Sequence, residues 1–164
     1  MKVRVESAER FRRSRAMLTF SPSTWSALLV PMPANPIYTP QQANQVLPWL
    51  TERLTALLSA AAELRNAQNT VETLTRRARG NGDHDLSQEL SAAEQSAEGG
   101  MRRVRELLNE IKGRGIQVRD VETGLVDFPG ERQGEPVWLC WKLGETEVGH
   151  WHEFDQGYSS RKPL

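Results

Sequence analysis

Two long apolar seams, separated by a glycine-rich stretch, constrain this chain more than any other feature. Apolar residues in the first seam recur at alternating steps of four and three: Ala43, Leu47, Leu50, Leu54, Leu57, Ala61 and Leu64. The second seam has the same spacing if Gly100 fills one position: Leu86, Leu90, Ala93, Ala97, Val104, Leu107 or Leu108, and Ile111. This spacing places apolar side chains on one helix face and is typical of a coiled coil. Because Gly80-Asn-Gly-Asp83 lies between the seams, we predict an antiparallel helical hairpin.

The ends of the predicted helices carry their own signals. Thr39-Pro40-Gln-Gln42 matches a capping box with proline in the first turn. Pro48 follows within the next turns and should bend or restart the helix. Gly99-Gly100 should cost about 1 kcal/mol per glycine relative to alanine, which is tolerable if another backbone approaches closely there or if the helix bends.

Both seams admit two interpretations: a core inside one chain, or a surface that joins chains. Two helices alone leave apolar surface uncovered, so we expect a third layer or a second copy of the chain. We favour the second copy, and therefore a homodimer. Charging the seam, for example by Leu57→Glu, should then abolish association.

The C-terminal region has the short alternating runs of strands. Val137–Leu143 and Val148–Phe154 are strand-like, Ile116–Val121 alternates over a short run, and Gly124–Pro129 is apolar around one acid. The predicted fold class is α+β, with a long antiparallel helical hairpin (37–113) followed by a small antiparallel β-meander (114–164), about three strands in all. Residues 37–164 would form this single domain. Residues 1–36 would be a disordered extension, or they would lie upstream of the true start, with Met32 as an alternative initiator. Their Arg- and Ser-rich composition also fits a targeting peptide, which we favour less.

Charge and cysteine content narrow the function classes. Residues 1–36 carry a net charge of about +4, and the remainder of this neutral chain is therefore about −4. An acidic body argues against nucleic-acid binding, which requires a basic face. No apolar run reaches the roughly 18–20 residues that span a bilayer. Cys140 is the only cysteine, so no intrachain disulfide can form and nothing requires an oxidising compartment.

The C-terminal strands hold the candidate site residues. His150 and His152 are two apart, so both rings point to one face of a strand and could supply two ligands to a divalent metal such as zinc, iron or manganese. Cys140, Asp127 and Glu145 are candidate third ligands. Glu153 is a weaker one, because it points to the opposite face. The alternative is a pair of structural histidines, which we favour.

The register between the last two predicted strands decides which residues face the histidines. A two-residue turn would place Trp141 opposite His150 and Leu139 opposite His152, on an apolar face. A three-residue turn would instead place Cys140 opposite His152. We favour the first register, because two-residue turns are commoner.

Asp127 lies between two apolar residues and needs a partner if it is buried. Arg161, Lys142 or a histidine could pair with it, either as a structural lock or as part of a site. Trp138, Trp141 and Trp151 occur on neighbouring predicted strands, and we expect them to be core or interface anchors more than a stacking platform.

The segments GLVDFPG, PVWLCWKLGE and VGHWHEFDQGYSSRKPL, preceded by YTPQQANQVLPWL, resemble the prokaryotic domain-of-unknown-function 2203 family. The resemblance begins at about Ile37 and runs to the C-terminus. It implies a cytoplasmic prokaryotic setting but supplies no activity and no site residues. Phosphate-loop, dinucleotide-binding, nucleophile-elbow and paired-cysteine motifs are missing from the sequence.

We therefore expect a cytoplasmic interaction or assembly module that acts as a homo-oligomer or with an unknown protein partner. The alternative is an enzyme that binds a metal or small ligand around Asp127, His150 and His152.

Overall fold

The computed structural model describes residues 36–81 and 85–164, and these described residues belong to one compact unit. The predictions for the N-terminal extension fall, apart from Pro36, outside the described residues. The predicted helix break at Gly80-Asn-Gly-Asp83 also falls largely outside them.

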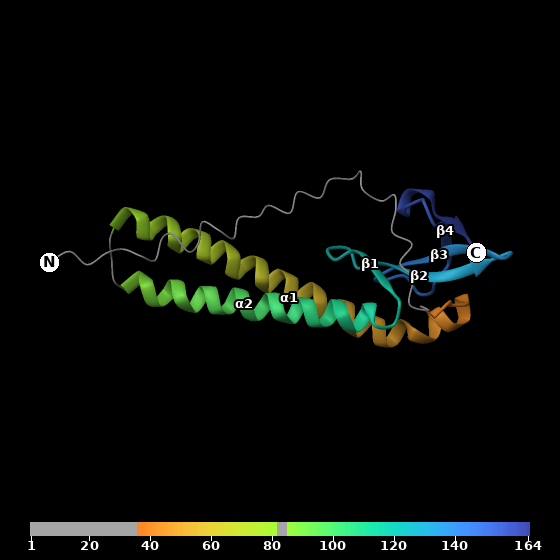
Figure 1. Ribbon diagram of the computed structural model, residues 1–164, viewed down its shortest axis with the longest axis horizontal. Coiled ribbons are helices and arrows are strands. Elements are labelled where there is room, and N and C mark those ends of the chain that lie inside the picture. The colour runs from red at the N-terminus through yellow and green to blue at the C-terminus, as the bar shows by residue number, and fades with distance from the viewer. Residues whose placement is uncertain (1–35, 82–84) are drawn as a thin grey trace, which may run out of the picture. The chain divides into compact units, whose positions relative to one another are not determined.

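Two helices form the predicted hairpin (Figure 1): α1 spans Pro40–Asn81 and α2 spans Asp85–Lys112. The capping box is present at the start of α1. The Thr39 N–H donates to Gln42 Oε1 at 2.9 Å, and the Gln42 N–H donates to Thr39 Oγ1 at 3.2 Å. These two bonds satisfy backbone donors that the first helical turn leaves free.

Pro48 does not restart the helix, because α1 is continuous from Pro40 to Asn81. Leu47 and Leu50 flank Pro48 and are buried, with 7% and 0% of their surface exposed. Burying each leucine side chain contributes about 2 kcal/mol of folding free energy. The two contributions together offset the roughly 3 kcal/mol that an internal proline costs a helix.

The two adjacent glycines in α2 differ in their surroundings. A Cβ atom at Gly100 would lie 3.2 Å from the Cβ of Leu64 in α1, so glycine at this position permits the close approach of the two helices. A Cβ atom at Gly99 would meet nothing within 4 Å. Only Gly100 therefore offsets its helix-propensity cost through packing within the chain.

The C-terminal region is a five-stranded antiparallel sheet in the order β1-β2-β3-β4-β5, two strands more than predicted. The strands are β1 (Gln117–Asp120), β2 (Leu125–Arg132), β3 (Glu135–Lys142), β4 (His150–Glu153) and β5 (Lys162–Pro163). Gln133 and Gly134 join β2 to β3 with φ values of 56° and 86°, as a two-residue hairpin turn with positive φ at both positions requires. The predicted α+β class is confirmed.

One face of the sheet packs on the helices. Its side chains share a single core with the first part of α1 and the end of α2: Val126, Phe128, Val137, Leu139 and Trp141, with Trp151 at the edge. The seam residues Leu50, Leu54 and Leu57 lie in this core with no exposed surface. This part of the first seam is therefore the interior of one chain.

The β3–β4 register differs from the one that we favoured. Cys140 lies opposite His150, and Trp138 lies opposite His152. The connection between the strands is residues 143–149, far longer than a tight turn. It is anchored by the Trp141 indole N–H, which donates to the Glu145 carbonyl, and by the Val148 N–H, which donates to Asn44 Oδ1 on α1. The helix thus sets a register that turn statistics do not predict.

Candidate functional site

A buried polar cluster lies on the sheet face that points away from the shared core. Asp127 on β2, Cys140 on β3 and His152 on β4 each offer one ligand atom, and these atoms all lie within 4.8 Å of one another. The three residues are 2%, 0% and 1% exposed. They are the one group of this kind among the described residues.

Strand pairing brings these residues together. Asp127 lies directly opposite Cys140, and Cys140 lies opposite His150, so His152 is one pleat farther along the same face. Because side chains two apart on a strand point to the same side, His152 reaches the cluster. The shift from the favoured register moves both histidines off the apolar face.

His152 is held by two contacts. Its Nδ1 atom lies 2.8 Å from the carbonyl oxygen of Glu153, and its Nε2 atom lies 3.3 Å from Asp127 Oδ2. A carbonyl oxygen only accepts hydrogen bonds, so Nδ1 must carry a proton. Nε2 then faces the carboxylate either with a second proton or with a lone pair.

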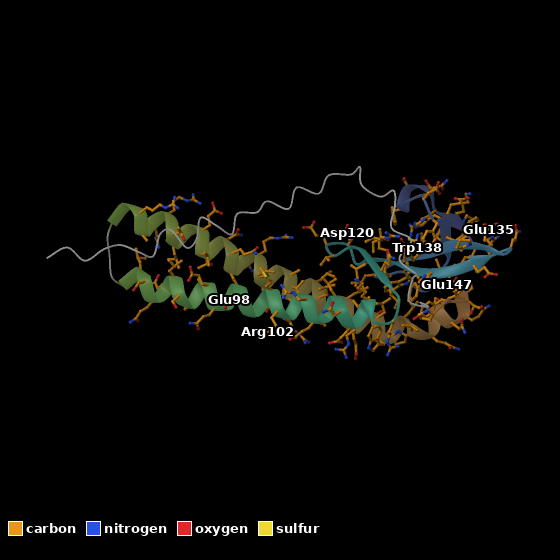
Figure 2. The ribbon with its side chains drawn as sticks, viewed as in Figure 1. Glu98, Arg102, Asp120, Glu135, Trp138 and Glu147 are labelled. Atoms are coloured by element: carbon orange, nitrogen blue, oxygen red, sulfur yellow. The ribbon has the colours of Figure 1, made fainter. Side chains whose placement is uncertain are left out.

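Arg119 is the main partner of Asp127. Its Nε–H donates to Asp127 Oδ2 at 2.6 Å, and its guanidinium lies 4.8 Å from the ring centroid of Trp138. The ring of Trp138, which is labelled in Figure 2, in turn stacks on the ring of Phe154, and the two ring centroids lie 4.4 Å apart. Sequence reasoning missed Arg119. The pairing of β1 with β2 shifts register between Val118 and Asp120, around Arg119. Arg119 lies two residues after Gln117, which is opposite Asp127, and only this alternation could have suggested that Arg119 faces the site.

The second carboxylate oxygen of Asp127, Oδ1, has no hydrogen-bond partner among the described residues. Oδ1 is also buried. A buried unpaired carboxylate oxygen is costly, so this atom is the one on which a bound cation or a water would act most strongly.

Cys140 is a protonated thiol at neutral pH. Burial raises its pKa to about 12, the negative charge of Asp127 adds to this effect, and the Arg161 guanidinium opposes it. A thiol in this state is a poor nucleophile, which argues against covalent catalysis. A metal ion would displace the proton and bind the thiolate.

The remaining predicted site residues lie around the cluster without joining it. His150 faces Cys140 across the strands, and its Nδ1 atom is buried with no hydrogen-bond partner in the described residues. Glu153 pairs with Lys162 at 2.5 Å. Arg161 pairs with Glu145 at 2.9 Å and lies near Cys140.

The predicted partners of Asp127 are therefore corrected in part. A histidine does pair with it, but Arg161 and Lys142 do not, because Arg119 occupies that place. The tryptophans are anchors as expected. Trp138 and Trp141 are buried on opposite faces of β3, and Trp151 packs against the core on the helix side.

Comparisons with known proteins identify the family. Within residues 36–81 and 85–164, no helix is both long and apolar enough to cross a membrane. Neither the curated proteins nor the solved structures contain a match to this chain. The family model described as "Uncharacterized conserved protein (DUF2203)" matches residues 36–164, which include both helices and the whole sheet. The chain therefore belongs to the DUF2203 family, as its C-terminal segments indicate.

Proposed function

We propose that this protein binds one divalent transition metal ion, zinc before iron or manganese, through Asp127, Cys140 and His152. The observation that carries the proposal is the orientation of His152. Its Nδ1–H donates to a backbone carbonyl while its Nε2 faces the Asp127 carboxylate. Metal-binding histidines in proteins are held in the same way, with one ring nitrogen on a carbonyl or carboxylate and the other on the metal.

A cation between His152 and Asp127 removes an electrostatic conflict. If Nε2 carries a lone pair, that lone pair and the carboxylate oxygen at 3.3 Å repel each other. A second proton on the ring relieves the repulsion, and so does a metal ion bound to Nε2. The metal alternative also gives a partner to the Oδ1 atom of Asp127, which accepts no hydrogen bond from the described residues.

The donor set favours zinc. One imidazole nitrogen, one thiolate sulfur and one carboxylate oxygen match the mixed ligands that zinc accepts in tetrahedral sites. Bound zinc would act as a Lewis acid for a ligand in the fourth position. Because the three side chains are almost fully buried, a role in holding β2, β3 and β4 together is better supported than turnover of a large substrate. A reducing cytoplasm would keep Cys140 available as a thiol, and we place the protein there.

Elemental analysis tests the proposal. The full chain would be produced without a histidine tag in zinc-supplemented medium, and its metal content compared with that of Cys140→Ser and Asp127→Asn. Glu147→Gln, in an exposed residue of the β3–β4 connection, is a matched control. We expect about one zinc per chain in the wild type and the control, and none in the two site variants. A folded wild type without metal would refute the proposal.

Homo-oligomeric assembly is the second candidate function. Some apolar side chains of the hairpin remain half-exposed, including Leu64 on α1 and Val104 on α2. Leu57, however, is fully buried inside the chain, so association would use another face of the hairpin than the central seam. Sedimentation equilibrium of the full chain at several concentrations would reveal such association.

A further inference from the structure

The segment that joins β4 to β5, residues 154–161, lies on the face of the sheet that carries the polar cluster. Figure 1 shows it on the side of the sheet away from the helices. At its start, the ring of Phe154 stacks on that of Trp138. At its end, Arg161 lies near Cys140. Trp138 and Cys140 are two residues apart on β3, so both point to the cluster face. We call residues 154–161 the C-terminal strap.

Arg161 fastens the end of the strap over the thiol of Cys140. Its Nη1 atom donates to Glu145 Oε1 in the β3–β4 connection at 2.9 Å, and only 15% of the Arg161 side chain and 28% of the Glu145 side chain are exposed. The guanidinium lies close enough to Cys140 for its charge and a side-chain hydrogen bond to lower the pKa of the thiol, against the larger effect of burial. Because Cys140 has no exposed surface, the Arg161 side chain is part of what separates it from solvent.

The rest of the strap is held weakly. Its 3₁₀ turn, η2 (Tyr158–Ser160), contains no buried residue, and 45% of Phe154 and 44% of Tyr158 are exposed. Directly after the strap, β5 pairs with β4 through only two residues, Lys162 and Pro163. Segments with few buried contacts open at a lower free energy than the whole fold. The strap can therefore open while β2, β3 and β4 remain paired.

The buried cluster requires an opening of this kind. Asp127, Cys140 and His152 are each at most 2% exposed, so a hydrated metal ion does not reach them while the strap is closed. The shared core fills the helix side of the sheet, which leaves the strap side as the route of entry. We propose that the C-terminal strap is a gate, which opens to admit the metal ion and closes when Arg161 pairs with Glu145. The inference rests on the proposed function, because it concerns how the ion reaches its ligands.

Cys140 reports opening of the strap without any metal, because it is the only cysteine of the chain. The rate at which a disulfide reagent such as DTNB modifies the metal-free full chain measures how often the thiol becomes accessible. Arg161→Ala removes the charged hydrogen bond that closes the strap and should raise this rate about tenfold, whereas Glu145→Gln weakens the bond and should raise it less. Arg161→Ala also removes a charge that favours the reactive thiolate, which alone would slow the reaction. A faster reaction therefore reports opening.

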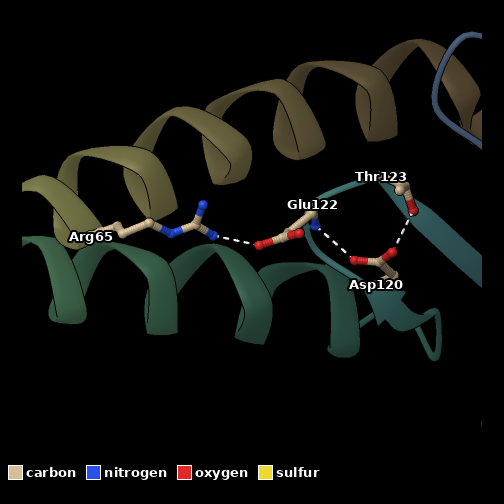
Figure 3. Close-up of polar contacts among 4 residues, drawn as sticks. All are labelled: Arg65, Asp120, Glu122 and Thr123. Carbon is tan, nitrogen blue, oxygen red and sulfur yellow. Dashed lines mark hydrogen bonds and ion pairs between the residues drawn. The ribbon is translucent and has the colours of Figure 1, made fainter.

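The ion pair between Arg65 and Glu122 supplies matched controls. It joins α1 to the β1–β2 connection, not to the strap, and both side chains are largely exposed (Figure 3). Arg65→Ala and Glu122→Gln make the same chemical changes as the strap variants and should leave the thiol reaction rate unchanged. Urea unfolding of every variant gives the fraction of globally unfolded chains. The strap variants should react faster than that fraction allows, which separates local opening from loss of the whole fold.

Zinc exchange tests the gate in the metal-loaded protein. Zinc uptake by the metal-free chain and zinc release to a chromophoric chelator are both followed by absorbance. Because Arg161 is not one of the proposed ligands, Arg161→Ala should raise both rate constants by the same factor, about tenfold, and leave the affinity for zinc unchanged. Arg65→Ala should exchange zinc at the rate of the wild type.

The outcomes separate the two levels of inference. A folded wild type that binds no zinc overturns the proposed function and, with it, the gate. A protein that binds zinc, but in which Arg161→Ala matches Arg65→Ala in thiol reactivity and in zinc exchange, overturns the gate alone. Faster zinc release with unchanged uptake also overturns the gate, because Arg161 would then stabilise the bound ion instead of closing its entry.

Discussion

The Nε2 atom of His152 lies 3.3 Å from Oδ2 of Asp127, while the same carboxylate oxygen accepts a hydrogen bond from Arg119 at 2.6 Å. A buried carboxylate between an imidazole and a guanidinium is held by partners from β1 and β4, two strands that do not pair with each other. The polar cluster therefore ties together four strands of the sheet.

Removing the Asp127 carboxylate should destabilise the metal-free protein. Asp127→Ala leaves His152 and Arg119 without their shared partner and should cost about 3 kcal/mol of unfolding free energy. Asp127→Asn should cost clearly less, because its amide can donate to the imidazole nitrogen. Urea unfolding in the presence of a chelator measures both values. Equal losses for the two variants would show that the carboxylate contributes through packing and not through hydrogen bonding.

Cys140 should set an alkaline limit for the metal-free protein. Its pKa rises from 9.0 to about 12 on folding, mainly through burial. Because the folded pKa is the higher one, the associated stability is complete below the unfolded pKa and is lost as the pH rises toward the folded pKa. We expect the urea midpoint of the wild type to fall more steeply between about pH 9 and about pH 12 than that of Cys140→Ser, whose hydroxyl does not titrate there. Parallel pH profiles would contradict this account.

Leu57→Glu should unfold the chain instead of merely separating subunits. Leu57 has no exposed surface and belongs to the core that both helices share with the sheet. The substitution removes the buried leucine side chain, and the new carboxylate must be desolvated or protonated. Together these effects cost about 4 kcal/mol or more. Thermal unfolding followed by circular dichroism measures the loss. Thr51→Glu, at an exposed position of α1, is the control and should change little. A stably folded, monomeric Leu57→Glu protein would argue that this seam joins subunits.

The two glycines of α2 make a matched pair. Gly99→Ala should raise the unfolding free energy by about 1 kcal/mol, because alanine favours the helix and its Cβ meets nothing within 4 Å. Gly100→Ala gains the same propensity, but its Cβ would lie 3.2 Å from the Leu64 Cβ, so part of the gain is lost to a shift of α1. We expect Gly99→Ala to be the more stable variant in urea unfolding. The reverse order would mean that α1 moves away from Gly100 without cost.

The sequence alone determined the helical part of this protein. The capping box at Thr39 and Gln42 depends on interactions within a few residues, and the period of the seams depends on one repeated spacing. Those features are local, so they can be read without knowing what packs against them.

Tertiary structure decided the candidate site. The β3–β4 register depends on a connection that is held by Asn44, 104 residues away from Val148 in sequence, and a shift of one residue exchanges the two faces of a strand. The same long-range packing placed Arg119 beside Asp127 and kept α1 continuous through Pro48. Sequence patterns identified Asp127, Cys140 and His152 as residues capable of chemistry. Only the packing of α1 against the sheet brought them to one buried point, because contacts between distant segments depend on the free energy of the whole fold.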